Sequence, residues 1–150
     1  MTKRIKLTKG LNINLVGAAE TEKRHIDNGK FYALRPSSFI GVTPSLTVKI
    51  GDKVKAGSAL FANKHYPDVT FSSPVSGVVK DIVRGDRRKI LAVVVEADDA
   101  QEYVDFGKKD VTAMTGDDVI KSLLEAGLLG YINQLPYAIS TNPEAKPKSI

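Results

Sequence analysis

The chain has 150 residues, 42% of them hydrophobic, and a formal net charge of +5. This length is typical of one domain, and the apolar fraction is enough for a packed core, so the composition excludes a disordered chain. The sequence has no cysteine, which excludes disulfides, thiolate zinc sites, iron–sulfur ligation and cysteine nucleophiles.

The N-terminal segments predict short strands. "RIKLT" and "LNINLVG" alternate polar and apolar residues, and "LTVKI" places Leu46, Val48 and Ile50 on one face. "FYALRP" also predicts a strand, which Pro36 ends because proline has no amide hydrogen for a sheet ladder. The basic start has no apolar stretch behind it and is therefore not a secretory signal. No apolar run is long enough to span a membrane.

Two hairpins follow. "ALFAN" and "VTFSS" flank "KHYPD", and "GVVKDIV" and "ILAVVVEA" flank "RGDRRK", where Gly85 opens the turn. About eight short strands separated by turns predict a small sandwich or barrel. The strands also supply the candidate core positions, which are Val48, Ile50, Val54, Leu60, Phe61, Val69, Phe71, Val78, Val79, Ile82, Leu91, Val93 and Val95.

The character of the sequence changes after Ala97. A charged connection leads to a predicted helix that begins at Thr115 as N-cap and ends at Gly127 or Gly130. Its predicted apolar face consists of Val119, Ile120, Leu123, Leu124 and Leu128. The remaining residues are Pro-rich and irregular, and those beyond about residue 138 are expected to be poorly ordered or held by neighbouring segments.

The most specific motif begins at Gly51. "GDKVKAGSAL" followed by "SPVSGVV", with Pro74 lying 14 residues after Leu60, resembles the biotinyl/lipoyl family. The alternative is a pair of ordinary hairpin turns. The resemblance covers about residues 40–97 and implies a barrel-sandwich hybrid of two interlocked halves. Together with the segments after Ala97, the expected fold is mainly β, a barrel-sandwich hybrid followed by a connection and one C-terminal α-helix. The structural turn positions are then Gly51, Gly57, Pro74, Gly77 and Gly85.

The expected domain organisation follows from these elements. Residues 1–100 form the barrel, residues 101–138 a linker and amphipathic helix, and residues 139–150 the start of a truncated following domain.

Carrier members of that family hold a modified lysine at a hairpin tip, eight residues before the motif's proline. Counting back eight residues from Pro74 gives Tyr66, and Lys64 lies ten residues before it. We therefore expect the scaffold without the attachment site, and no covalently bound cofactor. Lys64, His65 and Tyr66 remain weak candidates for surface contacts.

No catalytic set is predicted. The glycines match neither the P-loop nor the dinucleotide fingerprint, and His25 and His65 are far apart in sequence, which is a weak pattern for a metal site. Glu96, Asp98 and Asp99 could be read as an acidic cation site. Carboxylates at a strand end are, however, usually solvent-exposed residues where the chain leaves the sheet.

The densest basic cluster consists of Arg84, Arg87, Arg88 and Lys89, interrupted by Asp86. Aromatic residues do not interleave with it, which disfavours nucleic acid as a partner. Anionic lipid headgroups and an acidic partner protein both remain open.

A longer resemblance covers nearly the whole chain. "IKLTKGLNINLVGA", "YALRPSSFIGVTPSLTVKIGDKVKAGSALFANK", "PDVTFSSPVSGVVKDIVRGDRRKILAVVVEA" and "LLEAGLLGYINQLPY" are similar to the N-terminal part of the A-type subunits of sodium-translocating NADH:quinone oxidoreductases. Relatives tend to have arginine before a Pro-aromatic pair where this chain has Leu135, so no anion contact by that arginine is carried over.

The resemblance implies a peripheral subunit on the cytoplasmic face of the bacterial inner membrane, held by the other subunits of an electron-transfer complex. NADH, flavins and the iron–sulfur centre would belong to those subunits, and quinone contact is open for the full-length protein. The fragment alone is expected to be inactive. The alternatives are the N-terminal barrel of an Rnf-type electron-transport protein, a biotin or lipoate carrier, and a free-standing ligand-binding module.

Overall fold

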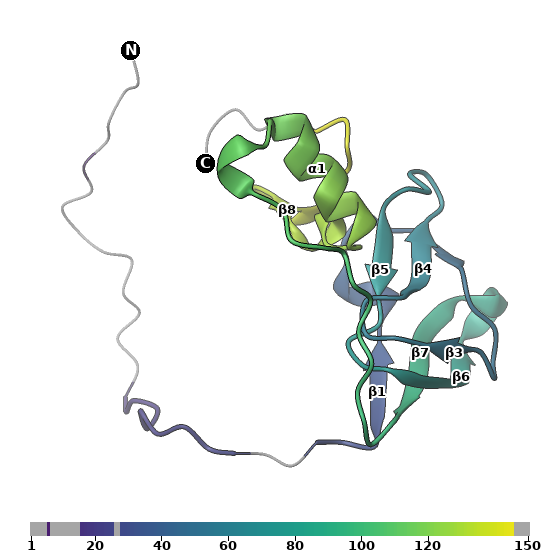
Figure 1. The fold of residues 1–150 in the computed structure, drawn as a ribbon. Helices are drawn as coiled ribbons and strands as arrows, with labels where there is room; N and C mark the ends of the chain where they lie inside the picture. Colours follow the sequence, from purple (N-terminus) through teal and green to yellow (C-terminus); the bar gives the residue numbers. More distant parts are fainter. Residues whose placement is uncertain (1–5, 7–15, 26–27, 146–150) are drawn as a thin grey trace.

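The fold is built on two antiparallel sheets that share one core (Figure 1). The structure is a computed structural model, and it describes residue 6 and residues 16–25 and 28–145. The first sheet has the order β1-β7-β6-β3, with β1 at Phe31–Leu34, β3 at Lys53–Val54, β6 at Gly77–Arg84 and β7 at Ile90–Ala97. The second has the order β2-β4-β5, with β2 at Pro44–Leu46, β4 at Ala59–Asn63 and β5 at Thr70–Ser72.

The two predicted hairpins are both present. β4 pairs with β5, and β6 pairs with β7 as the longest ladder of the molecule. Alternation along β7 turns Val93 and Val95 into the core, and Val79 lies opposite Val95 in the register. β1 ends before Pro36, as its missing amide hydrogen requires, and Pro36 opens the short 3-10 helix η1 (Pro36–Ser38).

Aromatic rings lie at the centre of the core. Phe61 and Phe71 are fully buried and stack with ring centroids 4.9 Å apart, and Phe39 lies against Phe71 at 4.3 Å. The sequence pattern did not indicate Phe39, because it lies in the turn after η1 and not in a strand.

Three of the expected strand and core positions are wrong. β2 ends at Leu46, so "LTVKI" is not a strand, and Ile50 is 62% exposed because it lies in the turn before Gly51. Leu91 is 41% exposed, since the register shifts between Val83 and Arg84 at the end of the hairpin. The two strands predicted at "RIKLT" and "LNINLVG" lie outside the described residues, apart from Lys6, Val16 and Gly17.

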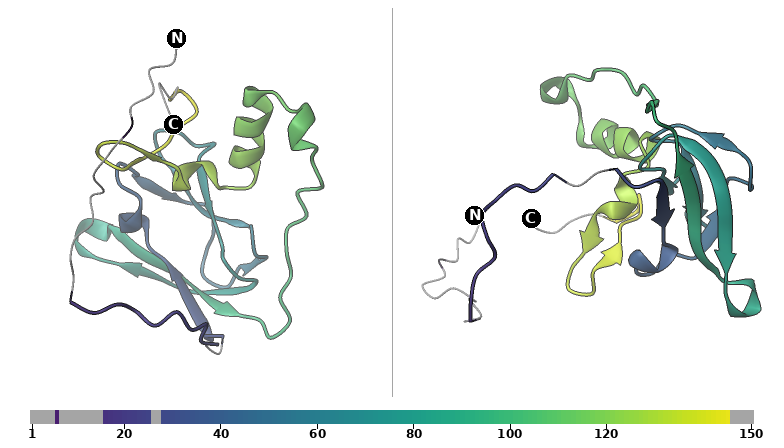
Figure 2. Two further views of the ribbon diagram at one scale, coloured as in Figure 1. Left: turned by 90° about the vertical axis from the view of Figure 1, so that its left-hand side faces the viewer. Right: turned by 90° about the horizontal axis from the view of Figure 1, so that it is seen from below.

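The remaining elements are short and mostly follow β7. They are η2 (Asp86–Arg88), η3 (Val111–Ala113), α1 (Gly116–Glu125), η4 (Leu129–Tyr131), β8 (Asn133–Gln134) and β9 (Ile139–Ser140). The segment from residue 98 to residue 115 returns along the barrel, where Ala56 and Tyr103 form an isolated bridge. Figures 1 and 2 show that this long connection brings α1 to the end of the barrel formed by β4 and β5.

Both ends of α1 are defined by local chemistry. The Thr115 hydroxyl accepts from the amide of Asp118, whose carboxylate accepts from the amide of Thr115, a reciprocal capping box. Gly127 ends the helix at φ 66, with its amide donating to Leu124 O and the amide of Leu128 donating to Leu123 O. This is the Schellman arrangement, in which glycine provides the left-handed residue.

The helix packs on the core through part of its predicted apolar face. Ile120, Leu123 and Leu124 contact the core cluster. Val119 and Leu128 are exposed, contrary to the expectation, because the barrel covers only one narrow side of a helix of three turns. Beyond the helix, the tail is not irregular throughout. β8 and β9 form a short hairpin that is held to the barrel by a parallel bridge between Ile40 and Ile139.

Candidate functional site

The hairpin between β4 and β5 is where a carrier domain would hold its lysine. Two consecutive turns form its tip. The amide of Tyr66 donates to Asn63 O at 3.1 Å, and the amide of Val69 donates to Tyr66 O at 2.9 Å. The first turn places Lys64 and His65 at its corners, and the second places Pro67 and Asp68 at its corners.

Lys64 lies in the first of these turns, directly after β4. Its amide donates to Thr43 O at 2.8 Å, which holds its backbone against the loop before β2. Tyr66 turns back toward the protein. Its ring packs against the core cluster and its hydroxyl lies 3.4 Å from a carboxylate oxygen of Glu144.

The predicted turn glycines have different geometries. Gly51 and Gly57 have φ of 94 and 100, where glycine is favoured. Gly77 begins β6 so close to β7 that an added Cβ would overlap the carbonyl oxygen of Glu96. Gly85 has φ −103, and the left-handed residues of its turn are Arg87 and Arg88.

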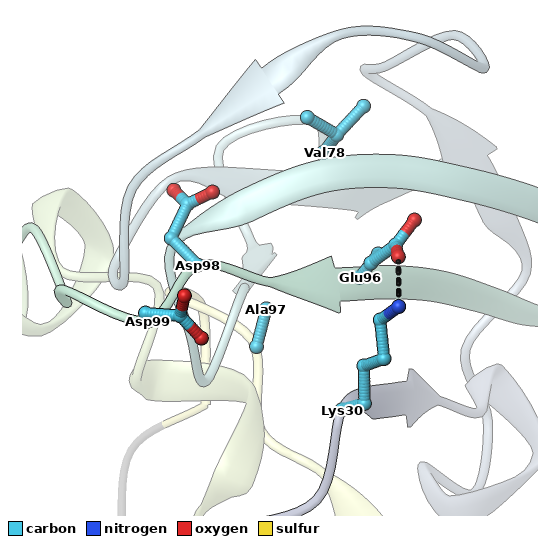
Figure 3. Close-up of a pocket in the computed structure, with 6 residues that line it drawn as sticks. All are labelled: Lys30, Val78, Glu96, Ala97, Asp98 and Asp99. Carbon is cyan, nitrogen blue, oxygen red and sulfur yellow. Dashed lines mark ion pairs between the residues drawn. The ribbon is translucent and has the colours of Figure 1, made fainter.

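An open groove of about 600 Å³ lies at the end of β7. Pro74, Val75, Tyr32 and Tyr103 line its apolar part, and Asp98 and Asp99 line its acidic part. The adjoining pocket in Figure 3 contains Glu96, whose carboxylate lies 3.0 Å from the ammonium groups of both Lys30 and Lys80.

These contacts stabilise the ionised form of the Glu96 carboxylate. Hydrogen bonds from Lys80 and then Lys30 lower the pKa of Glu96. Asp98 and Asp99 lie beyond the strand end (Figure 3) and are exposed. The arrangement around Glu96 is an ion-pair cluster that ties Lys30, the residue before β1, to β6 and β7, and it contains no nucleophile next to a base.

His25 and His65, which form only a weak metal pattern in the sequence, belong to no group of metal-ligating side chains among the described residues. In the part of the chain that the structure describes, no three His, Asp or Glu side chains lie close enough to hold a metal ion. None of the described helices is long and apolar enough to cross a bilayer.

A further surface was missed by the sequence analysis. We call it the C-terminal apolar surface, and its exposed members are Ile40, Leu128, Tyr131, Ile132, Leu135, Tyr137 and Ile139. Leu135 is 84% exposed and Tyr137 is 77% exposed, both in the turn between β8 and β9. The signal was present in "LLGYINQLPYAI", whose apolar density is higher than a solvated loop requires. Its position next to Ile40 appears only in the folded chain.

Two antiparallel sheets that share one core define a mainly β fold of the barrel-sandwich hybrid class. The family model of the NqrA N-terminal barrel-sandwich hybrid domain matches residues 5–98. The chain belongs to this family.

Curated relatives extend the similarity beyond the barrel. The chain is 34% identical over 148 residues to the A-type subunit of the Na(+)-translocating NADH-quinone reductase of Cellvibrio japonicus, and 34% identical over 149 residues to that of Photorhabdus laumondii. The corresponding protein of Pseudomonas aeruginosa strain UCBPP-PA14 is 31% identical over 148 residues. Each match covers 97% of this chain and 33% of the relative, so the chain spans about a third of the length of the curated relatives it matches.

Proposed function

We propose that this chain acts as the N-terminal part of the A-type subunit of a sodium-translocating NADH:quinone oxidoreductase, where its barrel is a docking element for other subunits. The observation that carries the proposal is the β4–β5 tip. The family's scaffold is present, but Lys64 lies in the first turn of the tip, directly after β4, and Tyr66 is turned back against the core. A barrel without a swinging arm still offers a rigid surface of fixed shape, which is what a docking element needs.

The C-terminal apolar surface supports the same function. Monomeric soluble proteins rarely expose large contiguous apolar patches, and such patches mark contacts with other proteins. The relatives are three times longer than this chain and are named as subunits of a reductase. We therefore assign the C-terminal apolar surface to a protein contact in the assembled complex.

The proposal places the redox chemistry elsewhere. NADH oxidation, flavin chemistry and iron–sulfur chemistry are assigned to the other subunits, at the cytoplasmic face of the membrane. The barrel contributes position and not electron transfer. Quinone contact is assigned to the full-length protein and not to any residue of this chain.

Affinity purification from the native host is the direct test. The tagged chain is isolated from detergent-solubilised membranes, the co-purifying proteins are identified by mass spectrometry, and the intact mass of the chain is measured. We expect the other subunits of the reductase and an unmodified mass. A lipoyl or biotinyl adduct on Lys64 would replace the docking function with a carrier function, and recovery of the chain without any other part of the reductase would refute the proposal.

The isolated chain provides a second readout. NADH oxidation, with and without quinone, should not exceed the buffer blank, because the chain has no cysteine for a cluster and no nucleotide fingerprint. Turnover that is lost on replacing Lys64 or His65 would contradict the docking function.

A further inference from the structure

The hairpin between β6 and β7 ends in a strongly basic tip, which we call the β6–β7 tip (residues 84–89). Its charged residues Arg84, Asp86, Arg87, Arg88 and Lys89 are all exposed. Figure 2 shows the hairpin extending away from α1 and from the β8–β9 hairpin. The tip is therefore separate from the part of the C-terminal apolar surface that β8 and β9 carry.

The backbone of this tip is held in an unfavourable conformation. The amide of Lys89 donates to Asp86 O at 3.1 Å, which closes a turn whose central residues are Arg87 and Arg88. Both have positive φ, 53 and 61, as in a type I′ turn. Such turns are dominated by Asn-Gly and similar pairs, because other side chains clash with the backbone at positive φ. Two arginines at these positions are a poor choice for stability, and retained strain of this kind concentrates at functional positions.

The charges of the tip are not neutralised within the protein. None of the four cations forms an ion pair with a described residue. The guanidinium of Arg84 donates instead to Arg88 O at 3.3 Å, which braces the turn. The tip thus presents three guanidinium groups and one ammonium group on a short, closed loop.

We propose that the β6–β7 tip binds a carboxylate-bearing surface of another protein of the complex, an inference that rests on the docking function proposed above. Guanidinium groups bind carboxylates in a planar, bidentate geometry that lysine does not provide. The two exposed aliphatic side chains nearest the tip, Val83 and Leu91, lie behind it in the strands. The outermost turn therefore has no apolar residue to insert into a bilayer, which favours a protein surface over lipid headgroups.

The turn allows a variant that removes positive charge without destabilising the fold. Arg87→Asn with Arg88→Gly replaces both arginines with the pair that a type I′ turn prefers, so the unfolding midpoint should rise by about 2–4 °C. The same variant removes two of the four positive charges. Lys108→Gln with Lys121→Gln is the matched control, because it removes two exposed charges elsewhere. Arg84→Gln with Lys89→Gln is a second test that leaves Arg87 and Arg88 unchanged.

The binding assay uses the full chain and the detergent-solubilised reductase complex. The complex is prepared from a host strain that lacks this chain. Vesicles of the host's extracted lipids form a parallel arm. We expect the wild type and the control to bind the complex equally, with affinity falling between about 50 and 500 mM NaCl. Both tip variants should bind it at least about tenfold more weakly. Vesicle binding should be the same for all four proteins.

The other outcomes are distinct. Tip variants that bind the complex like the wild type would overturn this proposal while leaving the docking function intact. Tip variants that lose binding only to vesicles would assign the tip to lipid and also overturn it. Failure of the wild type to bind the complex would refute the proposed docking function itself.

Discussion

The barrel and the C-terminal segment (residues 116–145) bury their apolar side chains to very different extents. In the barrel, Leu60, Phe61, Phe71 and Val93 have no exposed surface at all. In the C-terminal segment, Leu129 is the one large apolar residue with comparable burial, and most of the others belong to the C-terminal apolar surface. The barrel buries its apolar side chains against one another, whereas the C-terminal segment buries its apolar side chains mainly against the barrel.

The contact between the two regions explains this dependence. Leu129 joins the barrel core cluster, the ring of Tyr131 lies 4.9 Å from that of Phe39, and Gly130 lies directly over Phe71. Ser72 also donates its hydroxyl to Ala126 O. The C-terminal segment is therefore expected to unfold before the barrel, since most of its burial depends on side chains that the barrel holds in place.

The largest expected effect comes from removing the ring that both regions share. Phe71→Ala should lower the free energy of unfolding by about 3–5 kcal/mol, because it leaves a cavity at the centre of the core and removes the ring against which Gly130 packs. Leu135→Ala, on the exposed turn of the tail, should change it by less than about 0.5 kcal/mol. Urea titrations followed by circular dichroism compare the two. Equal losses would mean that the tail is as tightly integrated as the barrel.

Alanine substitutions at two glycines of the barrel compare the stability cost of steric overlap with that of backbone strain. Gly77→Ala should cost about 3 kcal/mol, since its Cβ would meet the Glu96 carbonyl in the paired strand. Gly51→Ala should cost about 1–2 kcal/mol, because its Cβ has free space and only its φ of 94 is unfavourable. Thermal melts of both variants measure the difference. An unchanged melt for Gly77→Ala would contradict the close approach of β6 to β7.

A third substitution should destabilise the C-terminal segment without destabilising the barrel. An added Cβ on Gly130 would lie 2.6 Å from the Phe71 ring, so Gly130→Ala should loosen the C-terminal segment by about 1–3 kcal/mol and leave the barrel folded. Hydrogen exchange should then accelerate in α1 and β9 but not in β6 and β7. Gly116→Ala, which meets no atom within 4 Å, is the control and should leave exchange unchanged. Faster exchange in both regions would show that they unfold as one unit.

The smallest effect is electrostatic and belongs to the barrel. Because Lys80 and Lys30 lower the pKa of Glu96 in the folded chain, their contribution to stability is present above the pKa of the unfolded chain, about 4.3. It is lost as the pH falls through the folded value. The urea midpoints of the wild type and Glu96→Gln should therefore differ at pH 7, and the difference should shrink as the pH falls below about 4.3. A difference that stays constant over that acid range would mean that the ion pairs are not its cause.

Several features of the site could be predicted from the chain itself, and others could not. The spacing between Lys64 and Pro74 predicts that the lysine misses the apex of the hairpin, and this stays a prediction. The same spacing did not predict that Tyr66 would turn back, because its contact with Glu144 joins residues 78 positions apart. The strain at Arg87 and Arg88 was also missed, since Gly85 was the obvious turn residue and two arginines carry no local signal for positive φ.

The sequence by itself determined what depends on neighbouring residues. Alternation predicted both hairpins, Pro36 ended β1, and Thr115 and Gly127 defined α1, because each of these rests on backbone geometry or on hydrogen bonds within a few positions. Tertiary structure decided which apolar residues became core. Ile50 and Leu91 fit a buried pattern but are exposed, while Phe39 and Leu129 fit no pattern and are buried. Burial depends on what lies across the space from a side chain, and that is fixed only when both sheets and the C-terminal segment close around Phe71.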